Sequence, residues 1–181
     1  MPFTVYKGEL WFLFARHKVS RELGDWAGGI KKHETALSGG FREFREESKE
    51  IFTEITLNDC ASQIALVDGV NMATIFVPIS YMWLDKASQK FKDATSECSS
   101  SNEISEAVWI SESKFYSLVR LPAYRGDIMW RKIRKFFGKT QLCDLISILK
   151  SSVESRCHFI EAEPEIEYYF RWDNRLIAVS S

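Results

Sequence analysis

Strand-like and helix-like segments follow one another without regular alternation along this chain of 181 residues. Runs of β-branched and aromatic residues favour strands, whereas apolar residues three and four positions apart favour helices. Because no β–α–β repeat is present, the order predicts an α/β (α+β) fold in which helices flank a mixed sheet. The expected strands lie in residues 3–6 and 10–15, which form a hairpin, and in 51–57, 64–67, 73–83, 107–110 and 166–179. The expected helices span 41–49, 126–139 and 142–153, and the expected loops span 24–32 and 86–102.

The composition favours one globular domain over residues 1–181. Hydrophobic residues make up 45% of the chain and aromatic residues 14%, which is enough for a sizeable core without disulfides. Lys and Arg number 24 against 25 Asp and Glu, so net charge gives no reason to expect nucleic-acid or membrane binding. Any such binding has to come from a local patch.

Two further patterns bear on the compartment. The four cysteines stand far apart with no CxxC pair, which argues against a zinc site and favours reduced thiols. The N-terminal residues lack the apolar stretch of a secretory leader, so we expect a cytoplasmic protein. The longest uncharged run, residues 69–84, is shorter than the roughly 18–20 residues of a membrane helix, so we expect no membrane span.

Glutamates gather in the charged segment that follows the first glycine-rich loop. On a helix, Glu43 is a neighbour of both Glu46 and Glu47, because residues three and four positions apart share a face. Each such like-charge pair costs roughly 0.2–0.5 kcal/mol, so several of them indicate a cation opposite the helix. Carboxylate oxygens suit Mg²⁺ or Mn²⁺, and Arg42 is placed for a bidentate pair with Glu34 or Glu46. The alternative is a solvated helix whose charges pair among themselves.

The spacing of these residues resembles the Nudix box, written G-x5-E-x7-R-E-U-x-E-E-x-G-U with U apolar. The matching positions are Gly28, Glu34, Arg42, Glu43, Phe44, Glu46 and Glu47. With its box at residues 28–50, the chain is similar to the Nudix hydrolase superfamily. This resemblance implies a Nudix-like α/β/α sandwich with a mixed β-sheet between helices.

The sequence departs from the box at several positions. Lys49 stands where the box has Gly, and Glu50 stands where it has an apolar residue. Replacing that Gly costs up to about 1 kcal/mol if the backbone there is left-handed. His33 also replaces a frequent Gly, and Gly39–Gly40 would weaken a helix, so we expect the regular helix to begin near Phe41. None of these changes removes a carboxylate, and activity is still expected.

The resemblance assigns roles residue by residue. The implied catalytic residues are Arg42, Glu43, Glu46 and Glu47. The arginine orients a glutamate, and the three glutamates bind Mg²⁺ or Mn²⁺, which acidifies bound water and stabilises charge on phosphates. The implied metal ligands are Glu43, Glu46, Glu47, the backbone carbonyl of Ala27, and Glu103, with Glu106 as the second choice for the last.

Basic residues near the box are candidates for substrate contacts. The expected substrate-binding residues are Arg16, Lys18, Lys31, Lys32 and Asp127. The first four would contact phosphates, and Asp127 would contact a base or ribose. For Asp127 the alternative is a structural role at the N-terminus of a helix, where the dipole favours an acidic residue.

A basic run interleaved with aromatic residues spans residues 125–139. Such a run is able to bind phosphates or RNA. The alternative is an amphipathic helix that buries Ile128, Ile133 and Phe137 and leaves its charges in solvent. The sequence leaves both interpretations open.

The function that the resemblance implies is Mg²⁺- or Mn²⁺-dependent hydrolysis of a P–O–P bond. The expected substrate is a nucleoside diphosphate linked to another group, either a nucleotide or the 5′ cap of an RNA. Two alternatives remain, namely a diphosphoinositol polyphosphate hydrolase and a Nudix-fold binding module without activity. The partners expected are a phosphoanhydride small molecule and, with capped RNA, a nucleic acid; the oligomeric state is left open.

Overall fold

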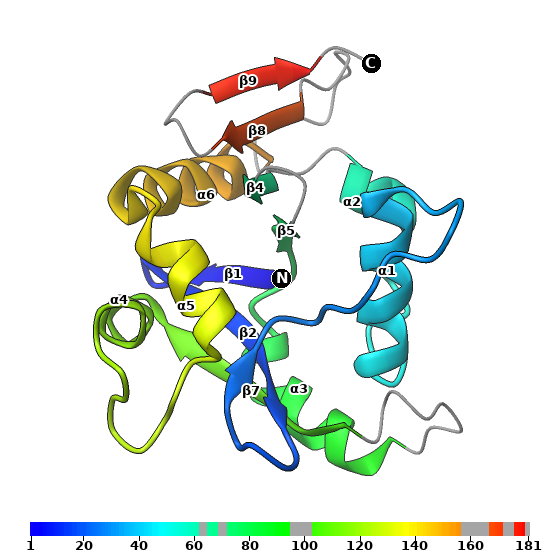
Figure 1. The fold of residues 1–181 in the computed structure, drawn as a ribbon, viewed down its shortest axis with the longest axis vertical. Helices are drawn as coiled ribbons and strands as arrows, with labels where there is room; N and C mark the ends of the chain where they lie inside the picture. Colours follow the sequence, from blue (N-terminus) through cyan, green and yellow to red (C-terminus); the bar gives the residue numbers. More distant parts are fainter. Residues whose placement is uncertain (62–64, 69–71, 95–102, 157–166, 172–175, 180–181) are drawn as a thin grey trace.

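The computed structural model describes residues 1–61, 65–68, 72–94, 103–156, 167–171 and 176–179 (Figure 1). The strands are β1 (Pro2–Tyr6), β2 (Glu9–His17), β3 (Leu23–Gly24), β4 (Ala65–Asp68), β5 (Met72–Ile75), β6 (Val77–Pro78), β7 (Ile104–Ser111), β8 (Glu167–Arg171) and β9 (Leu176–Val179). The helices are α1 (Ala36–Glu47), α2 (Leu57–Ala61), α3 (Trp83–Asp93), α4 (Glu112–Arg120), α5 (Arg131–Gly138) and α6 (Leu142–Arg156). Helices and strands are mixed along the chain, and parallel and antiparallel pairs share each sheet, which confirms the α+β class.

Strand β2 is the centre of the first sheet. It pairs antiparallel with β1, β3 and β7, and β1 pairs in parallel with β6 at the edge. The turn between β1 and β2 has positive φ at Lys7 (52°) and Gly8 (77°), as a two-residue hairpin of the favoured twist requires. The predicted hairpin is therefore confirmed, and so is the strand predicted at 107–110, which is longer than expected.

A second sheet has the strand order β5-β4-β8-β9. Strand β4 pairs antiparallel with β5 and parallel with β8, so the tail after α6 joins a strand from the middle of the chain. The single central strand predicted over 73–83 is wrong. Its first part belongs to this sheet and its next part, Val77–Pro78, pairs at the edge of the first sheet, where a proline without an N–H is tolerated.

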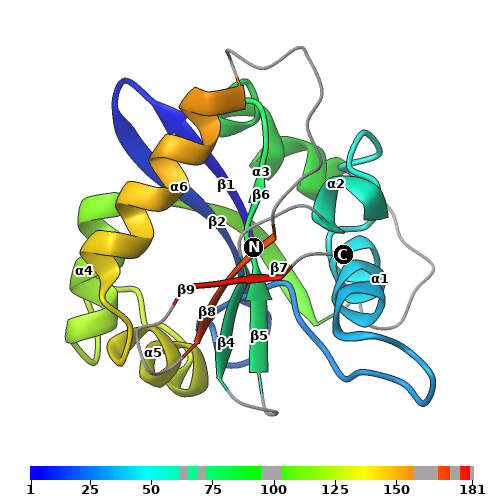
Figure 2. The ribbon, with the colours of Figure 1, turned by 90° about the horizontal axis from the view of Figure 1, so that it is seen from above.

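Helices cover both faces of the first sheet. Because side chains alternate across a strand, Leu10, Phe12 and Phe14 of β2 point to one face and Leu13 and Ala15 to the other. The first face packs against α4, α5 and α6, and the second packs against α1, α2 and α3. Figure 2 shows these two sets of helices on either side of the central strands.

Helix α1 begins at Ala36, not near Phe41 as expected. Thr35 caps it: the Thr35 hydroxyl accepts from the Ser38 N–H at 3.1 Å, and the Ser38 hydroxyl accepts from the Thr35 N–H at 3.0 Å. This reciprocal cap satisfies donors that the first turn would leave open. The capped start therefore extends the helix through Gly39–Gly40 despite their low helix propensity.

Two other segments differ from the sequence prediction. The strand predicted over 51–57 is absent: residues 51–56 form a turn-containing segment that leads into α2 at Leu57. Phe52 and Ile55 are buried against helices instead of pairing in a sheet. The loop predicted over 86–102 is helical up to Asp93, and its remaining part, 95–102, lies outside the described residues. The buried residues Ala87 and Phe91 of α3 are four positions apart, as in an amphipathic helix. The many polar residues between and around them make this helical spacing hard to recognise in the sequence.

The second half of the chain also differs from the sequence prediction. Helix α4 lies in a segment for which the residue pattern predicts no element. The helix predicted over 126–139 begins only at Arg131, because the preceding residues bridge to β3 through Leu23 and Met129. The helix predicted over 142–153 is confirmed as α6. Among the described residues, no helix combines the length and the apolar character needed to cross a bilayer.

Candidate active site

The loop that begins the box is attached to the central strand of the first sheet. Strand β3 leads into Asp25 and Trp26, and the Trp26 indole N–H donates to the Leu13 carbonyl of β2 at 2.9 Å. The Trp26 ring meets Phe44 of α1 edge to face, with 6.2 Å between centroids. Since Phe44 also stacks on Phe52, the apolar side of α1 is packed against the core and the loop is held beside the helix.

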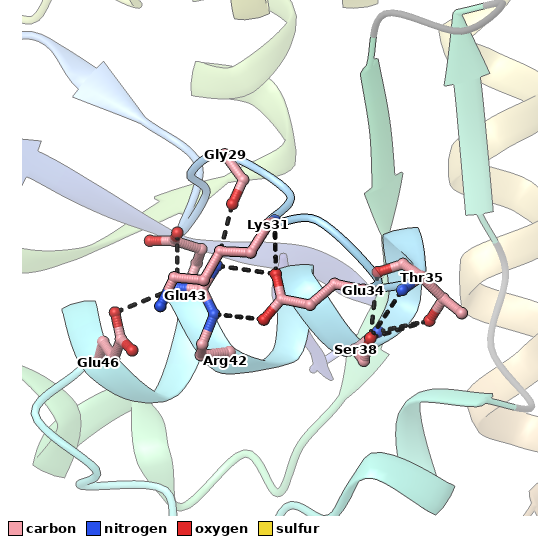
Figure 3. Close-up of polar contacts among 8 residues, drawn as sticks. All are labelled: Gly29, Lys31, Glu34, Thr35, Ser38, Arg42, Glu43 and Glu46. Atoms are coloured by element: carbon pink, nitrogen blue, oxygen red, sulfur yellow. Dashed lines mark hydrogen bonds and ion pairs between the residues drawn. The ribbon is translucent and has the colours of Figure 1, made fainter.

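Arg42 joins this loop to α1 through four acceptor groups (Figure 3). Its Nε and Nη2 donate to the two Glu34 oxygens at 2.7 and 3.1 Å, which is a bidentate pair. Its Nη1 donates to Glu43 at 2.7 Å and to Glu46 at 3.3 Å, and Nη2 also donates to the Gly29 carbonyl at 2.9 Å. The Arg42–Glu34 pair that the sequence offered as one of two options is therefore present.

Glu34 has a structural role in this arrangement. Besides the two bonds from Arg42, it accepts the backbone N–H of Lys31 at 2.8 Å. The Arg42 hydrogen bonds first, and then the Lys31 N–H, lower the pKa of Glu34 to about 2. Glu34 is therefore ionised across the physiological range and keeps Arg42 in place.

Close backbone approach explains the first glycine of the box. A Cβ placed on Gly28 would overlap the carboxylate of Glu43, whereas a Cβ on Gly29 would meet nothing within 4 Å. The backbone N–H of Ala27 donates to Glu47 at 3.0 Å. Two consecutive loop residues thus contact two carboxylates of α1, although 20 positions separate Ala27 from Glu47 in sequence.

Glu47 is the most buried of the three box glutamates of α1, with 5% of its surface exposed. Burial raises the pKa of Glu47 to about 8. The hydrogen bond from Ala27 acts in the opposite direction, and the nearby charges of Asp25, Glu43 and Glu103 raise the pKa further. Among the described residues no basic side chain pairs with Glu47, so its charge is compensated only by one neutral donor.

Glu103 and Glu106 have different surroundings. Glu103 is exposed just before β7, its carbonyl accepts the Lys18 N–H at 2.7 Å, and its charge acts on Glu47. Glu106 is paired with Arg16 at 3.0 Å and Arg21 at 2.9 Å. The first choice for an acidic residue from the later loop therefore lies near the box, and the second choice is engaged elsewhere.

The predicted substrate-binding residues fall into two groups. Arg16 is half-buried and bonds Asp127 at 2.7 Å as well as Glu106, and Lys114 pairs with the same Asp127. Burial raises the pKa of Asp127, but the hydrogen bonds from Lys114 and Arg16 outweigh it and leave that pKa lowered. Arg16 and Asp127 thus tie β2 to the segment before α5, and Asp127 is not at a helix N-terminus. Lys18, Lys31 and Lys32 are exposed.

The positions where the chain departs from the box have left-handed backbone. The φ angles of His33, Lys49 and Glu50 are 75°, 55° and 56°. Lys49 replaces a fixed glycine of the box and His33 replaces a frequent one, so the conformation that favours Gly is kept without it. Lys49 also donates its ammonium to the carbonyls of Phe91 and Ala94, both at 3.1 Å, and this links the end of α1 to the end of α3.

One acidic residue near the site was not identified from the sequence. Asp25 is buried, accepts the Trp26 N–H at 2.9 Å and accepts the Thr74 hydroxyl at 3.0 Å. Its charge acts on Glu47. The only signal in the sequence is its place three residues before Gly28, and that spacing has no meaning until the loop is folded.

The acidic side chains are not arranged around one central point. Within the described residues, no group of three or more His, Cys, Asp or Glu side chains has the geometry of a metal site. The reason is local: the Arg42 guanidinium draws Glu43 and Glu46 together, while Glu47 turns to the Ala27 N–H. Arg42 bonds Glu43 through Oε1 and Glu46 through Oε2, so the second oxygen of each carboxylate takes no bond from Arg42.

Comparison with protein-family models, with curated proteins and with solved structures gives no match for this chain. Any function assigned to the site therefore rests on its residues and their contacts.

Proposed function

We propose that this protein is a Nudix-type pyrophosphohydrolase that uses Mg²⁺ or Mn²⁺ to cleave a P–O–P bond in a nucleoside diphosphate-linked substrate. The observation that carries the proposal is the contact between the two halves of the box. Gly28 lies against Glu43, Ala27 bonds Glu47, and Arg42 joins Glu34 to the helix. Helices on both faces of the first sheet support a Nudix-like α/β/α sandwich as the fold.

The residues present suit a divalent cation. Glu47 is a buried carboxyl near three other acidic groups with one neutral donor, and such a site favours a hard cation. Glu43, Glu46 and Glu47 would hold the ion, with Glu103 and the Ala27 carbonyl as further oxygen ligands. A bound ion would make a water molecule more acidic and would stabilise charge on the phosphates.

Arg42 is a positioning residue in this proposal. It orients Glu43 and Glu46 while Glu34 fixes the guanidinium by two bonds. When an ion binds the glutamates, Glu34 and the Gly29 carbonyl retain Arg42 in place. The exposed ammonium groups of Lys18, Lys31 and Lys32 are left as the candidates for contacts to substrate phosphates.

A substrate panel with defined metal tests the proposal. The purified protein is stripped with chelator and incubated with Mg²⁺ or Mn²⁺ and a nucleoside triphosphate, a nucleotide sugar, a dinucleoside polyphosphate, capped RNA or an inositol pyrophosphate. We expect metal-dependent release of phosphate-containing products from at least one nucleotide or from capped RNA. If only the inositol pyrophosphate is hydrolysed, the substrate class is inositol pyrophosphates and not nucleotides. If a member of the panel binds but none is hydrolysed, the protein is a binding module and not an enzyme.

A further inference from the structure

Positive charge is concentrated in one stretch of the chain. Residues 120–139 contain seven Lys and Arg and one Asp, a net charge of +6 in a chain whose total is −1. The single acidic residue, Asp127, is buried and paired with Arg16 and Lys114. The stretch therefore presents positive charge to solvent with no exposed acidic residue of its own.

Among the residues that the structure describes, no acidic side chain pairs with the cations of α5, in contrast to the cations near the box. Within the described part of the chain, Arg131, Lys132, Arg134 and Lys135 form no ion pair, and α5 itself contains no Asp or Glu. By contrast, carboxylates pair with each of four arginines elsewhere in the chain, namely Arg16, Arg21, Arg42 and Arg45. Opposite charges four positions apart stabilise a helix in solvent, whereas the charged residues of α5 at that spacing are all basic and repel one another.

The packing of α5 turns these charges outward. Ile133, Phe136 and Phe137 are buried in the core between α5 and the first sheet. The four cations therefore lie on the opposite side of the helix. Aromatic rings flank them: Lys132 lies 5.3 Å from the Trp130 ring centroid, and Arg125 lies 5.3 Å from that of Tyr124. Trp130 and Tyr124 are only partly buried.

We propose that this face, which we call the α5 face (Arg125, Arg131, Lys132, Arg134 and Lys135 with Tyr124 and Trp130), binds single-stranded nucleic acid. Phosphates would pair with the unpartnered cations, and unstacked bases would lie on the exposed parts of the rings. The cations stand on an outward helix face and do not converge on one point, which suits an extended polyanion over a compact one. The apolar side of α5 is buried in the core, so the helix itself has no apolar face to insert into a lipid surface. Ile128, which the amphipathic-helix alternative would bury, lies before the helix and is 45% exposed, a single apolar side chain beside the cations.

The α5 face also has a defined relation to the candidate active site. The Leu23 N–H donates to the Ile128 carbonyl, and the Trp130 N–H donates to the Leu23 carbonyl, both at 2.8 Å. Strand β3 thus joins the start of α5 to the loop that reaches Gly28. Because α1 and α5 pack on opposite faces of the sheet, a nucleic acid that engages both would reach from one side of the sheet to the other past β3. A strand whose 5′ end carries the scissile phosphoanhydride is the substrate class that would do so; this step rests on the proposed function, whereas binding itself does not.

Direct binding without metal tests the α5 face separately from catalysis. Fluorescence anisotropy is measured with labelled RNA and DNA single strands of about 20 nucleotides, longer than one site of ~4–16. The variant carries Arg131→Glu and Lys135→Glu. The matched control carries Lys86→Glu and Lys92→Glu, two exposed lysines on α3, which packs on the opposite face of the sheet. Circular dichroism and thermal melts confirm that both fold.

We expect the α5 variant to bind at least about tenfold more weakly than wild type and the control to stay within about threefold. Loss of two phosphate contacts should reduce the slope of log K against log salt by about 1.4, at roughly 0.7 per contact for a single strand. Equal loss in both variants, no binding by wild type, or tighter binding to duplex would overturn the proposal. Co-sedimentation of wild type with phosphatidylserine vesicles but not with phosphatidylcholine vesicles, in the absence of oligonucleotide binding, would assign the face to membranes instead. If RNA binds but no member of the substrate panel is hydrolysed, the proposed activity is wrong and nucleic-acid binding by the α5 face still holds.

Discussion

Among the described glycines, Gly28 is the one whose backbone lies closest to a carboxylate of α1. Its missing Cβ leaves the space that the Glu43 carboxylate occupies, and Gly29 next to it has open space. The carboxylate is the end of a flexible side chain, so an added methyl group displaces Glu43 without a large loss of stability. Alanine at Gly28 therefore changes the position of Glu43, whereas alanine at Gly29 changes only the loop and serves as its control.

We predict that Gly28→Ala lowers metal-dependent activity at least about tenfold, near 1.4 kcal/mol of barrier, while Gly29→Ala stays near wild type. Both variants should melt within a few degrees of wild type. The measurement is the turnover rate across a titration of Mg²⁺, because a displaced ligand raises the metal concentration needed for half-maximal rate. Equal rates for the two variants would show that Glu43 does not act from the position described.

Glu47 offers the sharpest test of the metal role. Glu47→Gln keeps the shape of the side chain and removes its charge, which a Mg²⁺ ligand does not tolerate. We predict that turnover falls at least about 100-fold, near 2.7 kcal/mol of barrier. Glu50→Gln is the control, since Glu50 is an exposed acid beyond the same helix that pairs with Arg45 at 3.0 Å. A folded Glu47→Gln variant with wild-type turnover would return α1 to the interpretation of a solvated helix.

At the scale of single elements, the end of α1 combines a left-handed backbone with a contact to another helix. Lys49 has φ of 55°, and its ammonium links α1 to the last turn of α3. A substitution at this position changes two things at once, the strain of the left-handed backbone and the bond between helices. Comparison of two small residues separates them, because both remove the ammonium.

We predict that Lys49→Gly is more stable than Lys49→Ala by about 1 kcal/mol, since only glycine adopts a positive φ without cost. Lys49→Ala should be less stable than wild type, because it loses the bonds to Phe91 and Ala94 and keeps the strain. Urea unfolding measures the three free energies of unfolding. If the two variants are equally stable, the strain at this position is negligible.

At the scale of the whole molecule, stability should depend on the ionisation of one buried carboxyl. The pKa of Glu47 in the fold is about 8, above its ordinary value of 4.5. Between these values the unfolded chain releases the proton and the folded chain keeps it, so the free energy of unfolding falls as pH rises from about 5 to about 8. Below that window Glu47 contributes no pH dependence, and above it the loss is complete.

We predict that in chelator the melting temperature of wild type falls relative to that of Glu47→Gln as pH rises through this window. Adding Mg²⁺ at neutral pH should recover the loss for wild type and not for the variant, because a ligand that binds only the folded state stabilises it. Thermal melts at several pH values, with and without Mg²⁺, measure both effects. Parallel curves for the two proteins would mean that burial does not raise the pKa of Glu47 as described.

The sequence alone was sufficient for features that depend on local spacing. The first hairpin and the helix of residues 142–153 follow from residue type and period, and the structure contains both. The bidentate pair of Arg42 with Glu34 is one of the two options that the sequence left open. For Lys49 the sequence indicated only the cost of a left-handed backbone should one occur, and the structure shows that one does. Metal binding and hydrolysis stay predictions.

Only the tertiary structure decided which distant groups share one environment. Asp25 acts on Glu47 because the Trp26 indole bonds to Leu13 and fixes the loop, a contact that no local pattern encodes. Arg16 and Asp127, 111 positions apart, neutralise each other inside the fold, so of the proposed phosphate contacts only the lysines are exposed. The strand expected at 51–57 is absent because its apolar residues are buried against helices, where period carries no information about pairing. Spacing along the chain specifies neighbours on one element, whereas burial and charge in three dimensions depend on packing between elements.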